Sequence, residues 1–550
     1  MPARRPRRAA ALALATALLT AAPLALTPAI AQAATASAGQ ASAAAQADQA
    51  SPRLRFTDIP GSDGVVLKGN VFEPGDGAAH HPLLVLPASW SMNDLEYLAQ
   101  ARKLAAAGYV VVSYTTRGFW GSGGQISVAG PQDTADASKV IDWALAHTTA
   151  DPARIGMAGV SYGAGISLLT AAKDSRVKAV SAMSGWADLA ESLFGNETQH
   201  LESGDVLTVL GYLTGRPSAE TAQELTSFFG GDHPSEAQLR AWAAQRSVST
   251  MVDQMNANGT AVMLANAWGD NIFPPNQLTD FFQKLTGPKR LELRPGDHAT
   301  PEITGLAGLP NDVWTDTGSW LDHYVKGVDN GIDRAMPVHI KPQLQDGYED
   351  YPSWSAVTSR TSTLALGGRD WWNTGALGAG ASTGWRTTIT TGVSSGAGAG
   401  TVFLSSLSEQ FLKVPPMVSV PLLPRPFAAV WQSAPTTDEE QVRGAARVHL
   451  SVTPSAAQGS LIAYLYDVNA LGVGKLITQA PYTFLDRSPG QAFDADFPLM
   501  DTAYDVPAGH RLALVVGTVD AMYITHNPVG SQLTFGSPAN DPSFVSVPLR

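Results

Sequence analysis

Short apolar runs alternate with helical patterns from about residue 53 to residue 345. The runs are continuous rather than alternating, which is typical of parallel strands whose two faces are both covered. They are HPLLVLPAS at 81–89, GYVVVSYTT at 108–116, RIGMAGVS at 154–161, VKAVSAMSG at 177–185, TAVMLANAW at 260–268 and KRLELRPGD at 289–297. Segments such as 94–107 and 133–148 have the pattern of helices. Strand, helix and strand in repetition predict an α/β domain with a parallel sheet.

The alternation stops between about 189 and 258, where three amphipathic helical patterns follow one another at 189–213, 217–231 and 234–245. This insertion between two strands is long enough to form a helical cap over the edge of the sheet. The alternative is a helical packing layer that has no role in binding.

The pattern changes after about residue 350, where Gly, Ser, Thr and Pro become frequent and the strands become short with a period of two. Examples are 446–455, 461–468 and 510–519, which are separated by turn signals. This arrangement predicts an antiparallel β-sandwich. We therefore expect a catalytic domain over 53–350 and an all-β domain over 351–550.

The first 33 residues have the pattern of an export signal. Four arginines come first, then a long apolar stretch, then the small-residue site Ala31-Gln32-Ala33. Pro23 and Pro28 interrupt the apolar stretch, which disfavours the alternative of a membrane anchor. Residues 34–52 are rich in Ala, Ser and Gln and predict a flexible leader. The expected protein is secreted and has no membrane contact after cleavage.

Composition narrows the function. The formal charge is -12 and no basic run lies outside the N-terminus, which argues against nucleic-acid binding. The chain has no cysteine, and this excludes disulfides, a cysteine nucleophile and a cysteine-ligated metal. Its 550 residues are too many for one core and favour two or three domains. The composition does not fix the oligomeric state.

The stretch Gly-Val-Ser-Tyr-Gly at 159–163 raises the question of a catalytic serine. It follows an apolar strand pattern and precedes a helical one, as in the sharp turn that presents the nucleophile of an α/β-hydrolase. Gly159, Gly163 and Gly165 supply the room that such a strained turn needs. The helix that begins behind Ser161 favours developing negative charge. We predict Ser161 as the nucleophile; the alternative is a glycine-rich turn without chemistry.

A serine hydroxyl needs a base and an orienting acid, which follow it in this fold in the order acid, then histidine. His298 is the downstream histidine that directly follows a strand pattern at the end of the α/β region. Asp270 follows the preceding strand pattern and is the predicted acid; Asp188, one strand earlier, is the competing candidate. Asp297 is the chain neighbour of His298, and we expect it to be a surface or capping aspartate.

The oxyanion hole needs two donors that point at the developing charge. The backbone N–H of Tyr162, directly after the nucleophile, is the first candidate. The second comes from the loop after LLVLP, and so from Ser89 or Trp90.

The cap supplies candidates for the substrate pocket. Trp186, Phe194 and Phe228, with Phe229, are expected to line an apolar acyl or proline pocket; the alternative is packing between cap and core. Carboxylates in the cap could bind the free amine of a peptide, because an unpaired buried ammonium is costly. These are Glu191, Glu197, Glu202 and Asp205. A solvated helix face explains them as well and is the interpretation that we favour.

Together these motifs resemble the Xaa-Pro dipeptidyl-peptidase and cocaine-esterase-like acyl hydrolase family, over nearly all of the mature chain. The most specific stretch runs from 108 to 165 and holds GYVVVSYTTRGFWGSGG and DWALAHTTADPARIGMAGVSYGAG. The other matching stretches are IPGSDGVVLKGNVFEP at 59–74, Gly-Asp at 269–270, Asp-His at 297–298 and 421–455.

The resemblance implies that Ser161, Asp270 and His298 form a triad and that a C-terminal jelly-roll domain follows. Family members hydrolyse peptides with a penultimate proline, or esters and amides of small acids, and need no cofactor or metal. Some family esterases take a tyrosine hydroxyl as an oxyanion donor from the loop after the third strand. Here that loop offers Ser89 and Trp90, so a backbone amide is the expected donor.

The combined expectation is a secreted serine hydrolase that cleaves X-Pro dipeptides from peptide N-termini. A carboxylesterase or amidase acting on small acyl groups is the alternative within the class. A wall- or carbohydrate-binding protein with an inert hydrolase domain is the alternative from another class. An exposed aromatic strip would favour that last interpretation, and the nearest candidate is DWW at 370–372.

Overall fold

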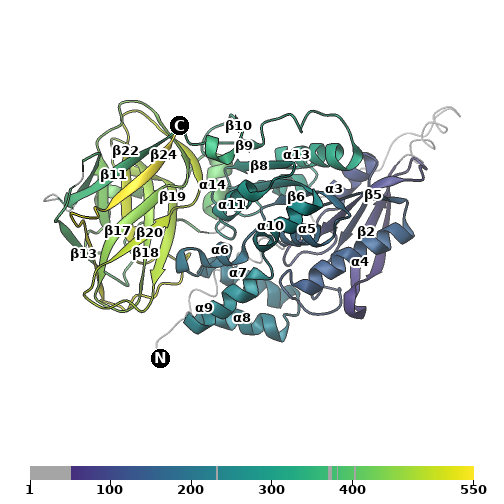
Figure 1. The fold of residues 1–550 in the computed structure, drawn as a ribbon, viewed down its shortest axis with the longest axis horizontal. Helices are drawn as coiled ribbons and strands as arrows, with labels where there is room; N and C mark the ends of the chain where they lie inside the picture. Colours follow the sequence, from purple (N-terminus) through teal and green to yellow (C-terminus); the bar gives the residue numbers. More distant parts are fainter. Residues whose placement is uncertain (1–50, 231–232, 370–373, 381, 402–403) are drawn as a thin grey trace, which may run out of the picture.

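The first part of the chain builds a ten-stranded sheet (Figure 1). The computed structural model describes residues 51–550 except 231–232, 370–373, 381 and 402–403. In chain order the strands are β1 (Arg53–Pro60), β2 (Val66–Glu73), β3 (His81–Pro87), β4 (Val110–Tyr114), β5 (Ala150–Val160), β6 (Val177–Met183), β7 (Ala261–Ala267), β8 (Lys289–Arg294), β9 (Val338–Ile340) and β10 (Glu349–Tyr351).

The sheet has the order β1-β2-β4-β3-β5-β6-β7-β8-β9-β10. The strands from β4 to β9 in this order run parallel, whereas β1, β2 and β10 join antiparallel at the two edges. The six strands predicted from apolar runs are β3 to β8. Their interior side chains are buried on both faces, which is why the runs read as continuous rather than alternating.

Helices cover both faces of this sheet. One face packs against α4 (Pro131–His147), α5 (Tyr162–Lys173), α10 (Val252–Asn258) and α11 (Asn276–Lys284). The other face packs against α3 (Leu98–Ala106), α12 (Ile303–Leu306) and α13 (Asp312–Leu321). Alternate residues of one strand serve the two layers: Val85 of β3 packs in the first core, and Leu84 and Leu86 pack in the second.

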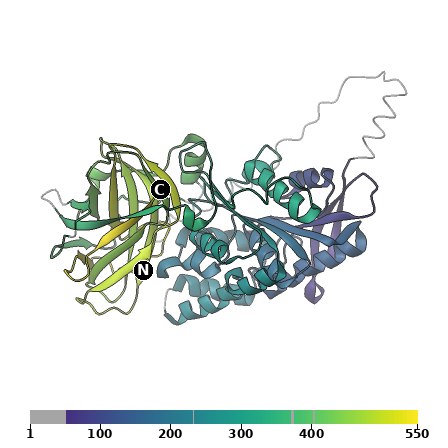
Figure 2. The ribbon, with the colours of Figure 1, turned by 45° about the horizontal axis from the view of Figure 1, so that its top comes forward.

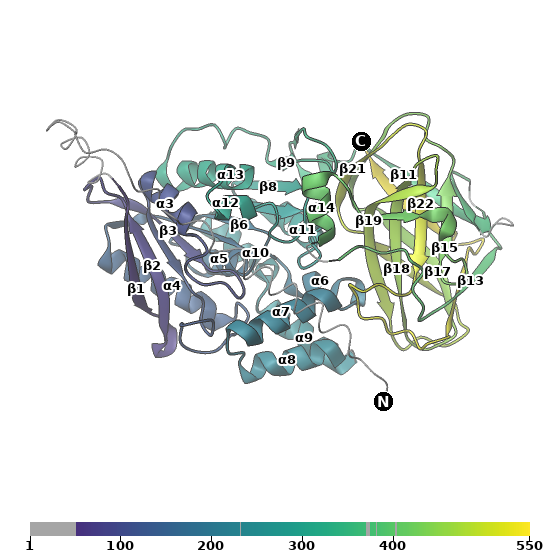
Figure 3. The ribbon, with the colours of Figure 1, turned by 180° about the vertical axis from the view of Figure 1, so that it is seen from behind.

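Between β6 and β7, where the sequence predicts a cap, lie α6 (Leu189–Phe194), α7 (Leu201–Thr214), α8 (Ala219–Gly230) and α9 (His233–Ala244). Figures 1 and 3 show these helices gathered on one side of the ten-stranded sheet. Two indole N–H groups anchor the cap and the segment that follows it. Trp90 Nε1 donates to the carbonyl of Leu207 in α7, and Trp186 Nε1 donates to the carbonyl of Arg246, just after α9. The cap is therefore held to the loops that follow β3 and β6.

The second part of the described chain is a β-sandwich at the far end of the molecule (Figure 2). Its strands enclose a second apolar core that includes Trp431, Val448, Leu514 and Phe535. The strands are β11 (Arg360–Arg369), β12 (Gly375–Gly378), β13 (Arg386–Thr390), β14 (Met417–Ser419), β15 (Ala429–Ser433), β16 (Glu440–Gly444), β17 (Arg447–Pro454), β18 (Gly459–Val468), β19 (Val473–Phe484), β20 (Phe493–Pro498), β21 (Thr502–Val506), β22 (Arg511–Gly517), β23 (Gln532–Gly536) and β24 (Phe544–Leu549), with one helix, α14 (Leu404–Leu412). The predicted fold class, an α/β-hydrolase domain followed by an all-β domain, is confirmed.

Polar contacts join the two domains. The side chain of Asn276 donates to the carbonyl of Leu499 at 2.9 Å, and Thr279 Oγ1 donates to Asp501 Oδ2 at 2.7 Å. Gln479 on β19 reaches Asn271, the residue after the predicted catalytic acid, at 3.5 Å. The β-sandwich thus packs beside the loop that carries Asp270.

Two sequence predictions lie outside the described residues: the signal and leader over 1–50, and the aromatic strip at 370–372. Among the helices of the described chain, none combines the length and the apolar character needed to span a bilayer.

Candidate active site

Ser161 sits in a strained turn between β5 and α5. Its backbone has φ 55° and ψ −117°, a conformation that a non-glycine residue rarely adopts, and its N–H donates to the carbonyl of Met183 at 2.8 Å. The backbone is crowded, because a Cβ atom on Gly163 would lie 2.1 Å from the carbonyl oxygen of Pro87. A Cβ atom on Gly159 would lie 2.4 Å from the carbonyl carbon of Gly163. The strained, glycine-flanked turn predicted around Ser161 is confirmed.

The structure brings Ser161, His298 and Asp270 together. Ser161 Oγ lies 2.7 Å from His298 Nε2, and His298 Nδ1 lies 3.0 Å from Asp270 Oδ2. Asp270 is held in turn, because its Oδ1 accepts the backbone N–H groups of Ile272 and Phe273 at 3.0 and 2.7 Å. A carboxylate on Nδ1 fixes the tautomer whose Nε2 accepts the serine proton.

The competing aspartates have other partners. Asp188 caps α6 by accepting the N–H of Glu191 at 3.1 Å and also accepts the hydroxyl of Ser249 at 2.9 Å. Asp297 is fully buried rather than at the surface. Its Oδ1 accepts the N–H groups of His298 at 2.7 Å and Asn271 at 3.2 Å, so it caps the loop that presents the histidine.

His298 lies in a negative environment. Burial disfavours its charged form, but the charges of Asp270, Asp297 and Glu302 outweigh burial, so the pKa of His298 is raised above its ordinary 6.5. Glu302 is a buried carboxyl that accepts the hydroxyl of Ser184 at 3.1 Å, and burial raises its own pKa to about 7. The sequence alone does not identify Glu302, since nothing local distinguishes it from a surface glutamate.

This environment predicts the pH dependence of hydrolysis. A general base must be neutral, so activity falls when His298 becomes protonated. Because its pKa is raised, we expect the acid limb of kcat/KM to have its midpoint above pH 6.5. Because the pKa of Glu302 is itself about 7, this carboxyl carries only part of a charge near the midpoint, so the Glu302→Gln variant should move the midpoint only slightly to lower pH. A midpoint at or below pH 6.5 in the wild type would contradict this assignment.

The structure corrects one predicted oxyanion donor. The backbone N–H of Ser89 donates to Glu96 Oε2 at 2.7 Å, and its hydroxyl lies 2.6 Å from Glu96 Oε1, so Ser89 is not available for the oxyanion. The buried carboxyl of Glu96 needs these donors; burial raises its pKa to about 7. Two candidates remain: the N–H of Trp90, beside the cavity, and the N–H of Tyr162. As the first residue of α5, Tyr162 has no acceptor within the helix.

A cavity of about 90 Å³ lies beside Ser161 beneath the cap. Most of its lining is apolar, with Trp90, Trp186, Leu207, Phe228, Trp242 and Phe273 among the larger side chains. Trp186 and Phe228, both predicted as substrate-pocket residues, line this cavity. Phe194, predicted with them, does not line the cavity: its ring packs under the guanidinium of Arg240 at 4.8 Å. Phe229 packs edge-on against Phe228 at 5.2 Å and does not line the cavity either.

The cavity wall also contains a carboxyl that the sequence analysis missed. Glu224 on α8 is only 6% exposed. Its Oε1 accepts the side-chain amide of Gln238 at 2.6 Å, whereas its Oε2 is buried and has no hydrogen-bond partner. An unsatisfied buried carboxylate oxygen is costly, and a donor from a bound substrate that reached this atom would remove that cost.

The cap carboxylates that the sequence did single out lie elsewhere. Glu191 and Glu197 pair with Arg240 at 3.5 and 2.8 Å, and both side chains are more than half exposed. Neither they nor Glu202 and Asp205 line the cavity. For Glu191 and Glu197 the solvated face is therefore the correct interpretation.

The fold, the strained turn and the hydrogen-bonded Ser–His–Asp arrangement define a serine hydrolase of the α/β-hydrolase fold. Residues 63–300 match the family described as X-Pro dipeptidyl-peptidase (S15 family). Residues 330–544 match the X-Pro dipeptidyl-peptidase C-terminal non-catalytic domain. The chain belongs to this family of hydrolases.

Curated relatives are distant. A protein of Mycobacterium bovis that is named as a serine esterase is 23% identical over 318 residues, which are 50% of this chain and 47% of the relative. A polyketide transferase of Penicillium crustosum is 25% identical over 281 residues, which are 44% of this chain and 90% of the relative. The chain thus spans about half the length of the mycobacterial relative that it matches.

Solved structures share the two-domain fold at low identity. A CocE/NonD family hydrolase from Staphylococcus aureus is 13% identical with a TM-score of 0.70, covering 91% of this chain and 94% of its own. An alpha-amino acid ester hydrolase is 17% identical with a TM-score of 0.70, and the match covers 96% of this chain and 100% of that chain. An aminopeptidase from a marine sediment Thaumarchaeota archaeon is 15% identical with a TM-score of 0.69, covering 96% and 100%. At these identities the likeness concerns the fold alone.

Proposed function

We propose that this protein is a serine peptidase that removes X-Pro dipeptides from the N-termini of peptides. The observation that carries the proposal is Glu224, whose side chain lines the cavity beside Ser161 and whose buried Oε2 has no hydrogen-bond partner. A substrate with a free α-amine brings an ammonium group, which is stable in an apolar pocket only when a carboxylate accepts its protons. Glu224 supplies that carboxylate in a mainly apolar cavity.

The apolar part of the cavity suits the proline ring. A pyrrolidine ring has no donor of its own once its nitrogen is acylated, and it gains stability from contact with apolar walls. The aromatic side chains of Trp90, Trp186 and Phe273 surround the space beside Ser161. The apolar walls therefore favour a ring without polar groups at this position.

The proposed reaction proceeds through an acyl-enzyme. Ser161 Oγ attacks the carbonyl carbon of the proline while His298 Nε2 takes the hydroxyl proton, and Asp270 stabilises the imidazolium. The N–H groups of Tyr162 and Trp90 donate to the oxyanion. His298 returns the proton to the leaving amine, and water activated by the same imidazole then releases the dipeptide.

An esterase or amidase acting on small acyl groups is the second candidate, since apart from Glu224 the cavity is mainly apolar. In that case Glu224 has no role in substrate binding. The third candidate, a binding protein with an inert hydrolase domain, is disfavoured because a chain under no demand for catalysis has no need of the Ser161–His298–Asp270 hydrogen bonds.

We further propose that the protein is exported and acts outside the cell. The support is the sequence pattern of residues 1–33, with its basic start, apolar stretch and small-residue cleavage site. Edman sequencing of the mature protein from the culture medium tests this, with a new N-terminus after Ala33 as the expected result. Retention of the intact N-terminus would contradict it.

The Glu224→Gln variant tests the role of the cavity carboxyl. We expect kcat/KM for Gly-Pro-anilide to fall about 10- to 100-fold, because a charge-assisted hydrogen bond to the substrate ammonium is replaced by a neutral one. Hydrolysis of a short acyl aryl ester, which has no amine, should change less than about twofold. The measurement is steady-state kinetics on both substrates.

The matched control is Glu191→Gln, which removes a carboxylate of the same cap that is 56% exposed and outside the cavity. It should leave both reactions unchanged. Equal losses on anilide and ester in Glu224→Gln would mean that Glu224 only supports the cap. A wild type that cleaves the ester and not the anilide would overturn the peptidase proposal in favour of the esterase.

A further inference from the structure

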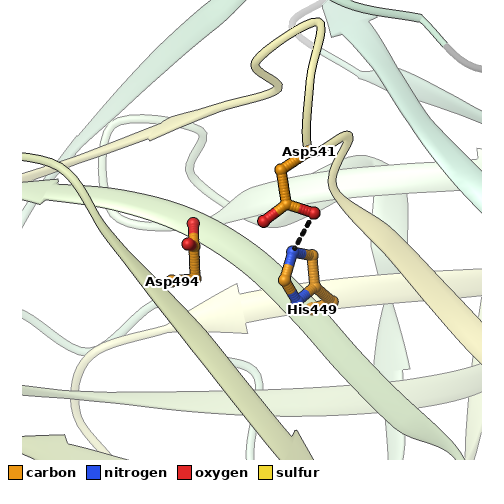
Figure 4. A group of neighbouring side chains, drawn as sticks. All are labelled: His449, Asp494 and Asp541. Atoms are coloured by element: carbon orange, nitrogen blue, oxygen red, sulfur yellow. Dashed lines mark ion pairs between the residues drawn. The ribbon is translucent and has the colours of Figure 1, made fainter.

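We propose that His449, Asp494 and Asp541 form a binding site for a divalent zinc-class ion on the β-sandwich (Figure 4). His449 comes from β17, Asp494 from the neighbouring strand β20, and Asp541 from the loop between β23 and β24. One ligand atom from each residue lies within 4.8 Å of the other two. The site is on the β-sandwich, outside the cavity that contains Ser161, and its role is structural.

The imidazole nitrogen that faces this cluster has no ordinary partner. His449 is only 9% exposed, and its Nε2 is buried without a hydrogen bond. Asp541 Oδ1 lies 3.2 Å away, within ion-pair range but outside hydrogen-bond geometry. A buried nitrogen without a hydrogen bond is costly, and a bound ion at this position would remove that cost. A tetrahedral zinc ion with bonds of about 2.0–2.1 Å sets neighbouring ligand atoms about 3.3 Å apart, which is close to the 3.2 Å between His449 Nε2 and Asp541 Oδ1. The carboxylate of Asp494 lies within 4.8 Å of both and would turn inward to complete the set.

The orientation of the His449 ring is also fixed by its neighbours, as is common for a histidine that binds a metal. It stacks on Phe544 with ring centres 5.0 Å apart and planes 17° from parallel. Its other nitrogen, Nδ1, faces Asp496 Oδ2 at 3.8 Å, and Asp496 is fixed by Arg447 at 2.6 Å. A metal-bound histidine commonly turns its second nitrogen toward a carboxylate, which sets the ring orientation.

The donor set indicates the kind of ion. Calcium and magnesium prefer sites made of oxygen alone, whereas an imidazole nitrogen with two carboxylates suits zinc. The side chain of Asp541 is 48% exposed and Asp494 is exposed, so both can turn onto an ion that arrives from solvent. The bound ion would join β17, β20 and the β23–β24 loop, and it would stabilise the folded β-sandwich by mass action.

The test uses the full chain without an affinity tag, stripped with a chelator and then desalted. Titration with Zn²⁺ in a calorimeter should give one ion bound per chain, and the midpoint of thermal unfolding should rise with zinc concentration. The Asp541→Asn and Asp494→Asn variants should each bind zinc at least tenfold more weakly. The exposed Asp438→Asn variant, on the loop between β15 and β16 of the same domain, should bind as the wild type does.

The two aspartate side chains are exposed or half-exposed, so we expect both variants to fold. They therefore test the site even if a substitution of the buried His449, such as His449→Gln, prevents folding. Binding of one zinc that both variants weaken supports the site. Lack of zinc binding, zinc binding that neither variant weakens, or tighter binding of Ca²⁺ than of Zn²⁺ would each overturn the proposal.

Discussion

The Ser161→Ala variant is expected to lose hydrolysis by about 10⁵- to 10⁶-fold in kcat. The hydroxyl 2.7 Å from His298 Nε2 is the proposed nucleophile, and alanine leaves the base with nothing to activate for acyl transfer. The fold should be unaffected, since the change removes one oxygen from a turn whose backbone is fixed by β5 and α5. Progress curves at high enzyme concentration, with circular dichroism for folding, measure both effects.

Ser167→Ala provides the matched control in the same helix. Ser167 is buried and its hydroxyl donates to the carbonyl of Gly163 at 2.7 Å, without reaching the cavity. This variant should keep kcat within about twofold of the wild type. A Ser161→Ala protein that retains more than about one hundredth of the wild-type rate would show that another group is the nucleophile.

The Asp270→Asn variant is expected to lose about 10⁴-fold in kcat. Asparagine keeps an oxygen for the N–H groups of Ile272 and Phe273, so the loop is preserved. Its amide, however, donates to His298 Nδ1 and forces the proton onto Nε2, where the imidazole can no longer accept the proton of Ser161. The kinetic assay is the same as for Ser161→Ala.

Asp188→Asn separates the two acids that the sequence leaves in competition. Asparagine caps a helix as well as aspartate does, so α6 should remain intact and kcat should stay near the wild-type value. If Asp188→Asn proves as damaging as Asp270→Asn, the assignment of Asp270 as the sole orienting acid fails.

The strands and the strained turn could be predicted from sequence because their causes are local. An apolar run such as 177–185 is buried on both faces wherever a parallel sheet forms, so its pattern is sufficient. The glycines around Ser161 are likewise explained within the turn itself, because the backbone of Gly163 leaves no room for a side chain at Gly159. The order of strands in the chain then brings Asp270 and His298 to the same edge as Ser161.

The site predictions that failed depend on structure that is not local in the sequence. They concern hydrogen-bond partners elsewhere in the chain, or side chains whose burial depends on how the whole cap packs. Ser89 could not be excluded as an oxyanion donor until Glu96 was seen to accept its N–H. Phe194 and Phe228 belong to the same apolar pattern, yet only Phe228 turns into the cavity. In the sequence Glu224 has the pattern of a polar helix position, and its burial follows from how α8 packs against α7 and α9.

The most direct test of the central claim is covalent labelling with a fluorophosphonate, followed by intact-mass measurement and peptide mapping. The account predicts one adduct per chain, on the peptide that contains Ser161, with no adduct in Ser161→Ala and slowed labelling in Asp270→Asn. An adduct on another residue, or labelling of Ser161→Ala at the wild-type rate, would contradict the assignment of Ser161 as the activated nucleophile.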